Sequence, residues 1–179
     1  MKKATEDLVN EHNAILKVLA ITEQVISIGD RDTLLKMEFG RELVFFLKTF
    51  ADKCHHGKEE GLLFPALINE GIQNQGGPIG VMLHEHILGR EYIASMSSAL
   101  DENNYDEFVA YAEKYISLLR NHINKENNVL FPMADNLLDE TKQDEIFKKF
   151  EEHEEVVIGH GVHEQLHSMI NHWENDLNN

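Results

Sequence analysis

The spacing of apolar residues is the feature that most constrains this fold. Apolar side chains recur every three or four positions through most of the chain, which is the spacing of a helix face rather than a strand. Only three prolines occur in 179 residues. We predict helices at roughly 4–28, 31–70, 78–102, 105–136 and 140–176. Four long helices with short connections favour an all-α, up-down four-helix bundle over about 4–136. An additional C-terminal fifth helix, about 140–176, should complete a single domain over 1–179. Gly159 and Gly161 leave a turn at 159–161 as an alternative within it.

The composition argues against some classes of binding partner. Acidic residues outnumber basic ones by 32 to 16, a net charge of −16, so we expect neither nucleic acid nor an anionic membrane as a partner. No apolar run approaches the roughly 18 residues of a transmembrane helix, and no secretory signal is visible. The single cysteine, Cys54, favours a cytoplasmic location. The oligomeric state stays open, a homodimer included.

One unit occurs twice, as "HHGKEEGLLFP" and as "HINKENNVLFP". Aligning the copies on Leu-Phe-Pro places His55 on His122 and Glu59 on Glu126, so the shared pattern is His-x-x-x-Glu-x-x-x-Leu-Phe-Pro. A histidine and a glutamate four residues apart lie on one helix face and can reach one point. The extra pair in the first copy is His56 and Glu60.

Helical phase predicts which side chains face the core. At about 100° per residue, His55 and Glu59 lie at the rim of the apolar stripe, whereas His56 and Glu60 point to water. The same test places one inward histidine on each of the other helices. These histidines are His12, His86, His122 and, on the fifth helix, His163.

Each of the four bundle helices thus offers one inward histidine, and two of them add an inward glutamate. These side chains would leave unpaired charge in an apolar core, unless cations neutralise it. Two carboxylates suit two ions, each glutamate bridging both. The mixture of imidazole and carboxylate favours iron or manganese, and a lone cysteine argues against structural zinc. The Glu-x-x-His spacing of ferritin-like bundles occurs at Glu164–His167 but is not duplicated in the core helices. Coordination positions left open could take a small molecule.

Four segments carry a family resemblance: "NEHNAIL", "CHHGKEEGLLFPAL", "LHEHILGREYI" and "RNHINKENNVLFP". Together they resemble the hemerythrin-like family, also called HHE cation-binding domains, over most of residues 8–132. The resemblance implies a hemerythrin-like four-helix bundle with a non-haem di-iron cofactor, two iron ions sharing an oxo or hydroxo bridge. The ligands that it implies are His12, His55, Glu59, His86, His122 and Glu126.

The sequence departs from the invertebrate oxygen carriers of that family. They use a His-x-x-x-His helix and an aspartate after the last histidine. Here the residue four positions after His86 is Arg90, and the last carboxylate is Glu126. A fifth histidine ligand must come from elsewhere or be missing. We predict His163, with His84, His167 and the absence of a fifth ligand as alternatives.

These observations favour a di-iron protein that binds O2, or a related diatomic or peroxide ligand, as an oxygen-binding or sensing protein. One alternative is a di-iron enzyme that consumes peroxide or nitric oxide, and the sequence does not decide whether the protein is an enzyme. Another is an iron donor for the repair of damaged iron centres. That role ranks third, because the family members associated with it often carry an extra cysteine-bearing domain that this sequence does not show. A metal-free interaction bundle ranks last.

Overall fold

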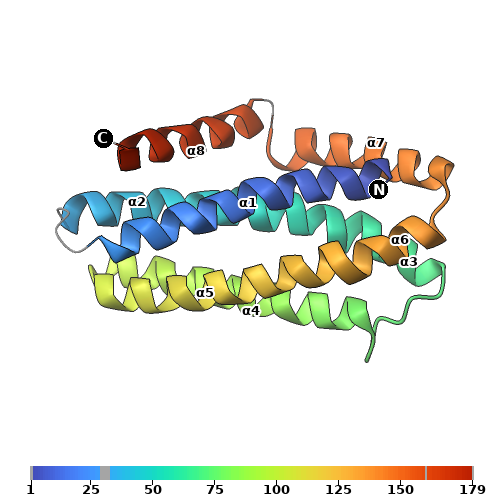
Figure 1. Ribbon diagram of the computed structural model, residues 1–179, viewed down its shortest axis with the longest axis horizontal. Coiled ribbons are helices and arrows are strands. Elements are labelled where there is room, and N and C mark those ends of the chain that lie inside the picture. Colours follow the sequence, from blue (N-terminus) through green and yellow to red (C-terminus); the bar gives the residue numbers. More distant parts are fainter. Residues whose placement is uncertain (1, 29–32, 160, 179) are drawn as a thin grey trace.

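The computed structural model describes residues 2–28, 33–159 and 161–178, apart from the side chains of residues 33, 163 and 178. Helices account for nearly all of these residues, and no strand occurs among them. Each of the four long helical rods runs antiparallel to the rod before it, and a further helical segment lies lengthwise along one side of the bundle (Figure 1). The predicted all-α bundle with an added C-terminal helical segment is therefore confirmed. None of the described helices combines the length and apolarity that a membrane crossing requires.

The four rods follow the predicted ranges closely. The first rod is α1 (Lys3–Ser27), and the second consists of α2 (Thr33–Phe46), η1 (Leu47–His56), η2 (Glu59–Leu63) and α3 (Phe64–Asn69). The third rod is α4 (Pro78–Asp101), and the fourth consists of α5 (Tyr105–Lys125), η3 (Glu126–Leu130) and α6 (Phe131–Leu137). The predicted start of the second helix at residue 31 lies outside the described residues.

The segments η1, η2 and η3 are π-helical, with backbone hydrogen bonds that reach five residues back. The Phe64 N–H donates to the Glu59 carbonyl, and the Phe131 N–H donates to the Glu126 carbonyl. A proline follows each phenylalanine, and in a regular α-helix its ring would clash with the carbonyl four residues earlier. The wider turn relieves that clash. Such turns inside α-helices are frequent at functional sites.

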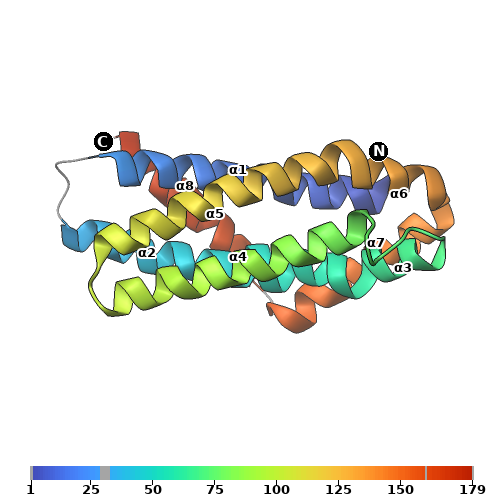
Figure 2. The same cartoon turned by 90° about the horizontal axis from the view of Figure 1, so that it is seen from below.

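The fifth helical segment is broken between residues 157 and 162, which agrees with the predicted alternative of a turn at 159–161 and not with one unbroken helix over 140–176. It consists of α7 (Glu140–Val157) and α8 (Val162–Asn178). Gly159 and Gly161 have φ of +90° and +83°, a left-handed backbone that glycine adopts without strain and that ends α7. The two views place α7 beside the N-terminal part of α1 and α8 beside its other end (Figures 1 and 2).

Two apolar clusters fill the interior, one near each end of the bundle. Phe46, Phe108 and Trp173 belong to the cluster near α8, whereas Phe64, Phe131 and Phe150 belong to the cluster near α7. A layer of buried polar side chains separates them, and every rod contributes to it. Burying polar groups is unfavourable unless they have hydrogen-bond or ionic partners. This layer is therefore the candidate for a functional site.

Candidate metal centre

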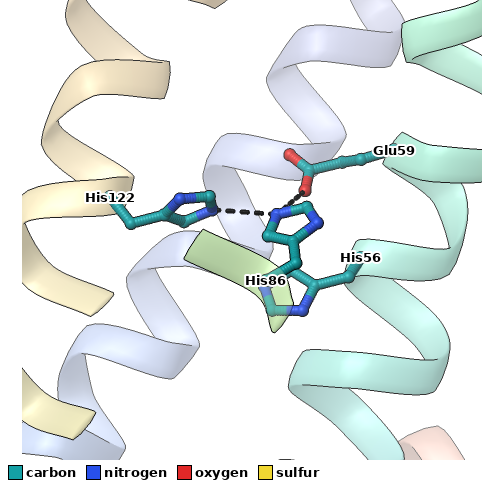
Figure 3. Close-up of side chains that lie close together, drawn as sticks. All are labelled: His56, Glu59, His86 and His122. Carbon is teal, nitrogen blue, oxygen red and sulfur yellow. Dashed lines mark hydrogen bonds and ion pairs between the residues drawn. The ribbon is translucent and has the colours of Figure 1, made fainter. Parts of the chain in front are cut away.

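The buried polar layer contains two groups of donors that could each hold a metal ion. One group is His56, Glu59, His86 and His122, and the other is His12, His55, Glu59 and Glu126. Within each group the donor atoms lie within 4.8 Å of one another, and all of these side chains are buried. Figure 3 shows the first group, with His86 between Glu59 and His122. The fold thus brings the six core residues predicted from the sequence to one place, with Glu59 shared by both groups.

Each glutamate lies between the histidine of its own motif and a histidine from another rod. One Glu126 oxygen is 3.2 Å from Nε2 of His122 and 3.2 Å from Nε2 of His12. The Glu59 oxygens are 3.6 Å from Nε2 of His55 and 3.4 Å from Nε2 of His86. The two copies of the motif therefore serve equivalent places in an arrangement with approximate two-fold symmetry.

The outer nitrogen of four imidazoles is held by a side chain behind it. Nδ1 pairs with a side-chain oxygen in His55–Glu11 (2.8 Å), His86–Glu60 (2.7 Å), His122–Glu85 (3.0 Å) and His12–Asn127 (2.7 Å). A partner of this kind fixes the tautomer and orientation of a ligating histidine and leaves Nε2 facing the metal.

The partners of Nδ1 repeat with the motif. Glu11 immediately precedes His12, and Glu85 immediately precedes His86. Each of these carboxylates also pairs with a lysine that directly precedes the motif glutamate, Lys58 for Glu11 and Lys125 for Glu85. The same row of contacts, from histidine to carboxylate to lysine, therefore occurs twice, as His55–Glu11–Lys58 and as His122–Glu85–Lys125. We call each row a lysine buttress.

The phenylalanine of each Leu-Phe-Pro also contributes to the site. Phe64 stacks on His86 with ring centroids 5.9 Å apart, and Phe131 stacks on His12 at 5.4 Å. These rings close the site toward the α7 end of the bundle and join the donors to the apolar cluster there.

His56 was predicted to point to water, and that prediction is wrong. Its side chain is only 3% exposed and its ring stacks on His86 at 3.8 Å. The reason is the π-helical backbone of η1, where each residue turns by less than the 100° used to assign the helix faces. Glu60 is half-buried and holds the outer nitrogen of His86, so it lies between the site and water.

His56 has the features of a donor. Neither ring nitrogen has a hydrogen-bond partner among the described residues, and the Asp52 carboxylate stays 3.6 Å from Nδ1. Burial, followed by the neighbouring charge of His86, lowers the pKa of His56 well below its usual value. The ring is therefore neutral, which is the form that binds metals.

The three other candidates for a fifth histidine ligand are placed differently. The side chain of His163, in α8, lies outside the described residues, so its role stays a prediction. His84 and His167 are exposed, and neither belongs to the two donor groups.

The donor atoms lack other partners. Nε2 of His12 and His55 and all four carboxylate oxygens of Glu59 and Glu126 form no hydrogen bond with the described residues. Unpaired buried polar atoms are rare in folded proteins. Burial alone would raise the pKa of Glu126, but the charges of His122 and His12 hold it well below its usual value. Burial lowers the pKa of His122, yet Glu126 and other carboxylates raise it to about 10. The site therefore favours positive charge, and its imidazole and carboxylate donors suit iron.

A helical bundle that gathers histidines and carboxylates from facing helices defines the class of metal-binding helical bundles. Within that class the chain belongs to the hemerythrin family: residues 3–134 match the hemerythrin HHE cation binding domain. The family therefore covers the four rods, while α7 and α8 lie beyond the matched residues.

The chain is also similar to two kinds of bacterial repair protein. It is 36% identical over 89 residues to the iron-sulfur cluster repair protein YtfE of Musicola paradisiaca, which is 45% of this chain and 40% of that protein. It is 29% identical over 133 residues to the iron-sulfur cluster repair protein DnrN of Neisseria gonorrhoeae, 68% of this chain and 81% of that protein. The match thus spans about two fifths of the YtfE relatives. No solved structure matches the chain with significance.

Proposed function

We propose that this protein binds two iron ions in its central site and supplies iron for the repair of iron–sulfur clusters. The observation that carries the proposal is the pair of buried donor groups sharing Glu59. The names of the YtfE and DnrN relatives, both iron-sulfur cluster repair proteins, support repair over the oxygen-binding role that the sequence favoured. Iron held there would supply redox and Lewis-acid chemistry. The repair role suits the cytoplasmic location that the single Cys54 favours.

In this proposal one ion is held by His56, His86 and His122, and the other by His12, His55 and Glu126. Glu59 reaches both. His56 takes the place of His163 as the fifth histidine, since it is buried inside the donor group with both nitrogens unpaired.

The donor histidines differ in how firmly neighbouring side chains hold them in place. Carboxylates or an amide hold Nδ1 of four histidines, but no side chain that the structure describes holds His56 in this way. A histidine that is held only by ring stacking can turn away more easily than one fixed at its outer nitrogen. We therefore expect the ion bound by His56 to be the one released to an acceptor.

Transfer of labelled iron tests the repair role. The protein is loaded with ⁵⁷Fe and mixed with an iron–sulfur enzyme whose cluster has been damaged by nitric oxide, together with sulfide and a reductant. We expect the enzyme to regain activity and to contain the label. The control is the same concentration of free ferrous iron with metal-free protein. Recovery no greater than in that control would refute the donor role.

A small-molecule role is the second candidate. Each donor group has four residues, and an octahedral ion has positions beyond those four for O2, nitric oxide or peroxide. The iron-loaded protein is reduced, mixed with O2, nitric oxide or hydrogen peroxide in separate samples, and followed by its absorption spectrum. A reversible spectral change supports binding, and steady-state consumption distinguishes an enzyme from a carrier. An unchanged spectrum with all three ligands contradicts this candidate.

A further inference from the structure

The two lysine buttresses of the site are equivalent in sequence but not in surroundings. The side chain of Lys125, which supports Glu85, is 39% exposed. The side chain of Lys58, which supports Glu11, is 0% exposed. The difference arises because α7 lies against η1 and η2 on the Lys58 side.

Lys58 is surrounded by three carboxylates from two other helices. Its Nζ is 2.8 Å from Glu11 and 3.0 Å from Asp7, both on α1, and it also pairs with Glu154 on α7. Burial by itself lowers the pKa of Lys58, but the charges of Glu11 and Asp7 raise it above its usual value. The ammonium group therefore stays charged, and its position depends on these partners.

A second set of contacts ties α7 to the same turn of the second rod. Nε2 of His153 is 3.0 Å from the backbone oxygen of Lys53. A Cβ atom added at Gly57 would lie 2.6 Å from that same nitrogen, too close without movement of His153. The absence of a side chain between His56 and Lys58 thus lets α7 approach the residues that carry the donors.

We propose that Glu154 is a positioning residue for the metal centre. Through Lys58 and Glu11 it holds His55 with Nε2 directed at the ion that His55 shares with His12. Glu154 is 96 residues from Lys58 in sequence and lies outside the part of the chain that matches the family domain. The helix α7 is therefore part of the site, and its displacement loosens one half of the centre while the Lys125 half stays intact. This inference rests on the proposed iron site.

The test compares Glu154→Ala with Glu155→Ala, a matched change at the exposed neighbouring position on α7. In metal-free protein, NMR of the histidine rings measures how fast the Nδ1 proton of His55 exchanges with water. We expect roughly tenfold faster exchange in Glu154→Ala, with the Nδ1 proton of His122 unchanged as an internal reference. In iron-loaded protein we expect one of the two ions to pass to a chelator about tenfold faster, as for other partners of metal ligands.

A second variant guards against loss of folding. Gly57→Ala keeps every charged residue but puts a methyl group where Nε2 of His153 lies, so that the His153 ring must move and its contact with the turn is lost. A change at His55 of the same kind, and smaller than in Glu154→Ala, is expected. Exchange at His55 and iron loss equal to those of Glu155→Ala in both variants would overturn the proposal. If the wild-type protein holds no iron, the proposed function fails, but the exchange measurement on metal-free protein still decides the role of Glu154.

Discussion

His56 and Ile123 occupy equivalent positions in the two copies of the motif, one residue after the motif histidine. Both are buried, but only the first offers a donor atom. The two donor groups consequently differ, with three histidines and one glutamate in one and two of each in the other. This single difference breaks the approximate symmetry of the centre at the residue scale.

Replacing His56 by the residue of the second copy tests its role. We expect His56→Ile to lower the binding affinity for one of the two ions by about tenfold or more, because one protein ligand is lost. The metal-free protein should not lose stability, since a buried imidazole without a hydrogen bond is exchanged for an apolar side chain. Stepwise iron titration with elemental analysis measures the first effect and thermal unfolding the second. His84→Ile, at an exposed position, is the control. Two ions bound with unchanged affinity would show that His56 is no ligand.

The positions of Glu11 and Glu85 in the sequence hint at their role, although the assignment of helix faces took no account of them. Each directly precedes an inward histidine, in "NEHNAIL" and in "LHEHILG". One residue along a helix turns about 100°, so these carboxylates face a neighbouring helix rather than the core centre. The repeated Glu-His pair could therefore indicate a supporting role. Which histidine each one supports could not be predicted, since that depends on which rods are adjacent.

At the scale of the elements, the π-helical turns connect the prolines to the site. Glu126 begins η3 and Phe131 directly follows it, and both contact His12. An α-helical turn in this place would rotate Phe131 relative to Glu126 and separate these two contacts. The Leu-Phe-Pro sequence is thus a local determinant of the donor geometry.

Pro132→Ala tests that connection. Alanine restores a backbone N–H and removes the clash with the carbonyl four residues earlier, so a regular α-helix becomes accessible. We expect the metal-free protein to be at least as stable as the wild type, while the affinity for iron falls. Thermal unfolding and iron titration measure the two quantities. Pro78→Ala, at the start of α4 where the N–H is unpaired in any case, should change neither. An unchanged iron affinity in Pro132→Ala would contradict the role given to the turn.

The break in the fifth helix is a second lesson at this scale. The apolar spacing continues across residues 140–176, so periodicity predicted one helix. The glycines at 159 and 161 adopt left-handed backbone and allow α7 and α8 to pack on opposite ends of α1. Periodicity reports which face of a segment is apolar, but not whether two such faces belong to one straight helix.

At the scale of the whole molecule, the polar layer between the two apolar clusters links metal binding to folding. Donors from all four rods meet there, and most of their inward atoms have no hydrogen-bond partner among the described residues, apart from the contact between Nε2 of His86 and Nε2 of His122. An ion bound there would hold the rods together and remove the cost of burying the unpaired atoms.

Iron should therefore stabilise the fold. With ferrous iron at 100 times its dissociation constant, we expect about 2.7 kcal/mol of added stability for each ion bound. For a chain of this length that corresponds to a rise in Tm of about 5–10 °C. Differential scanning calorimetry under anaerobic conditions, with and without a chelator, measures the shift. Glu59→Gln, which weakens a donor shared by both groups, should show a smaller rise. A Tm that does not respond to iron in the wild type would contradict the site.

The sequence by itself determined the helices, the duplicated motif and the six core donors. These follow from spacing along one helix, which is a local property. The tertiary structure alone decided that His56 turns inward, that Lys58 supports Glu11 and that α7 lies over one half of the site. Those features depend on π-helical turns and on how closely separate helices approach, and neither can be read from the periodicity of a single segment.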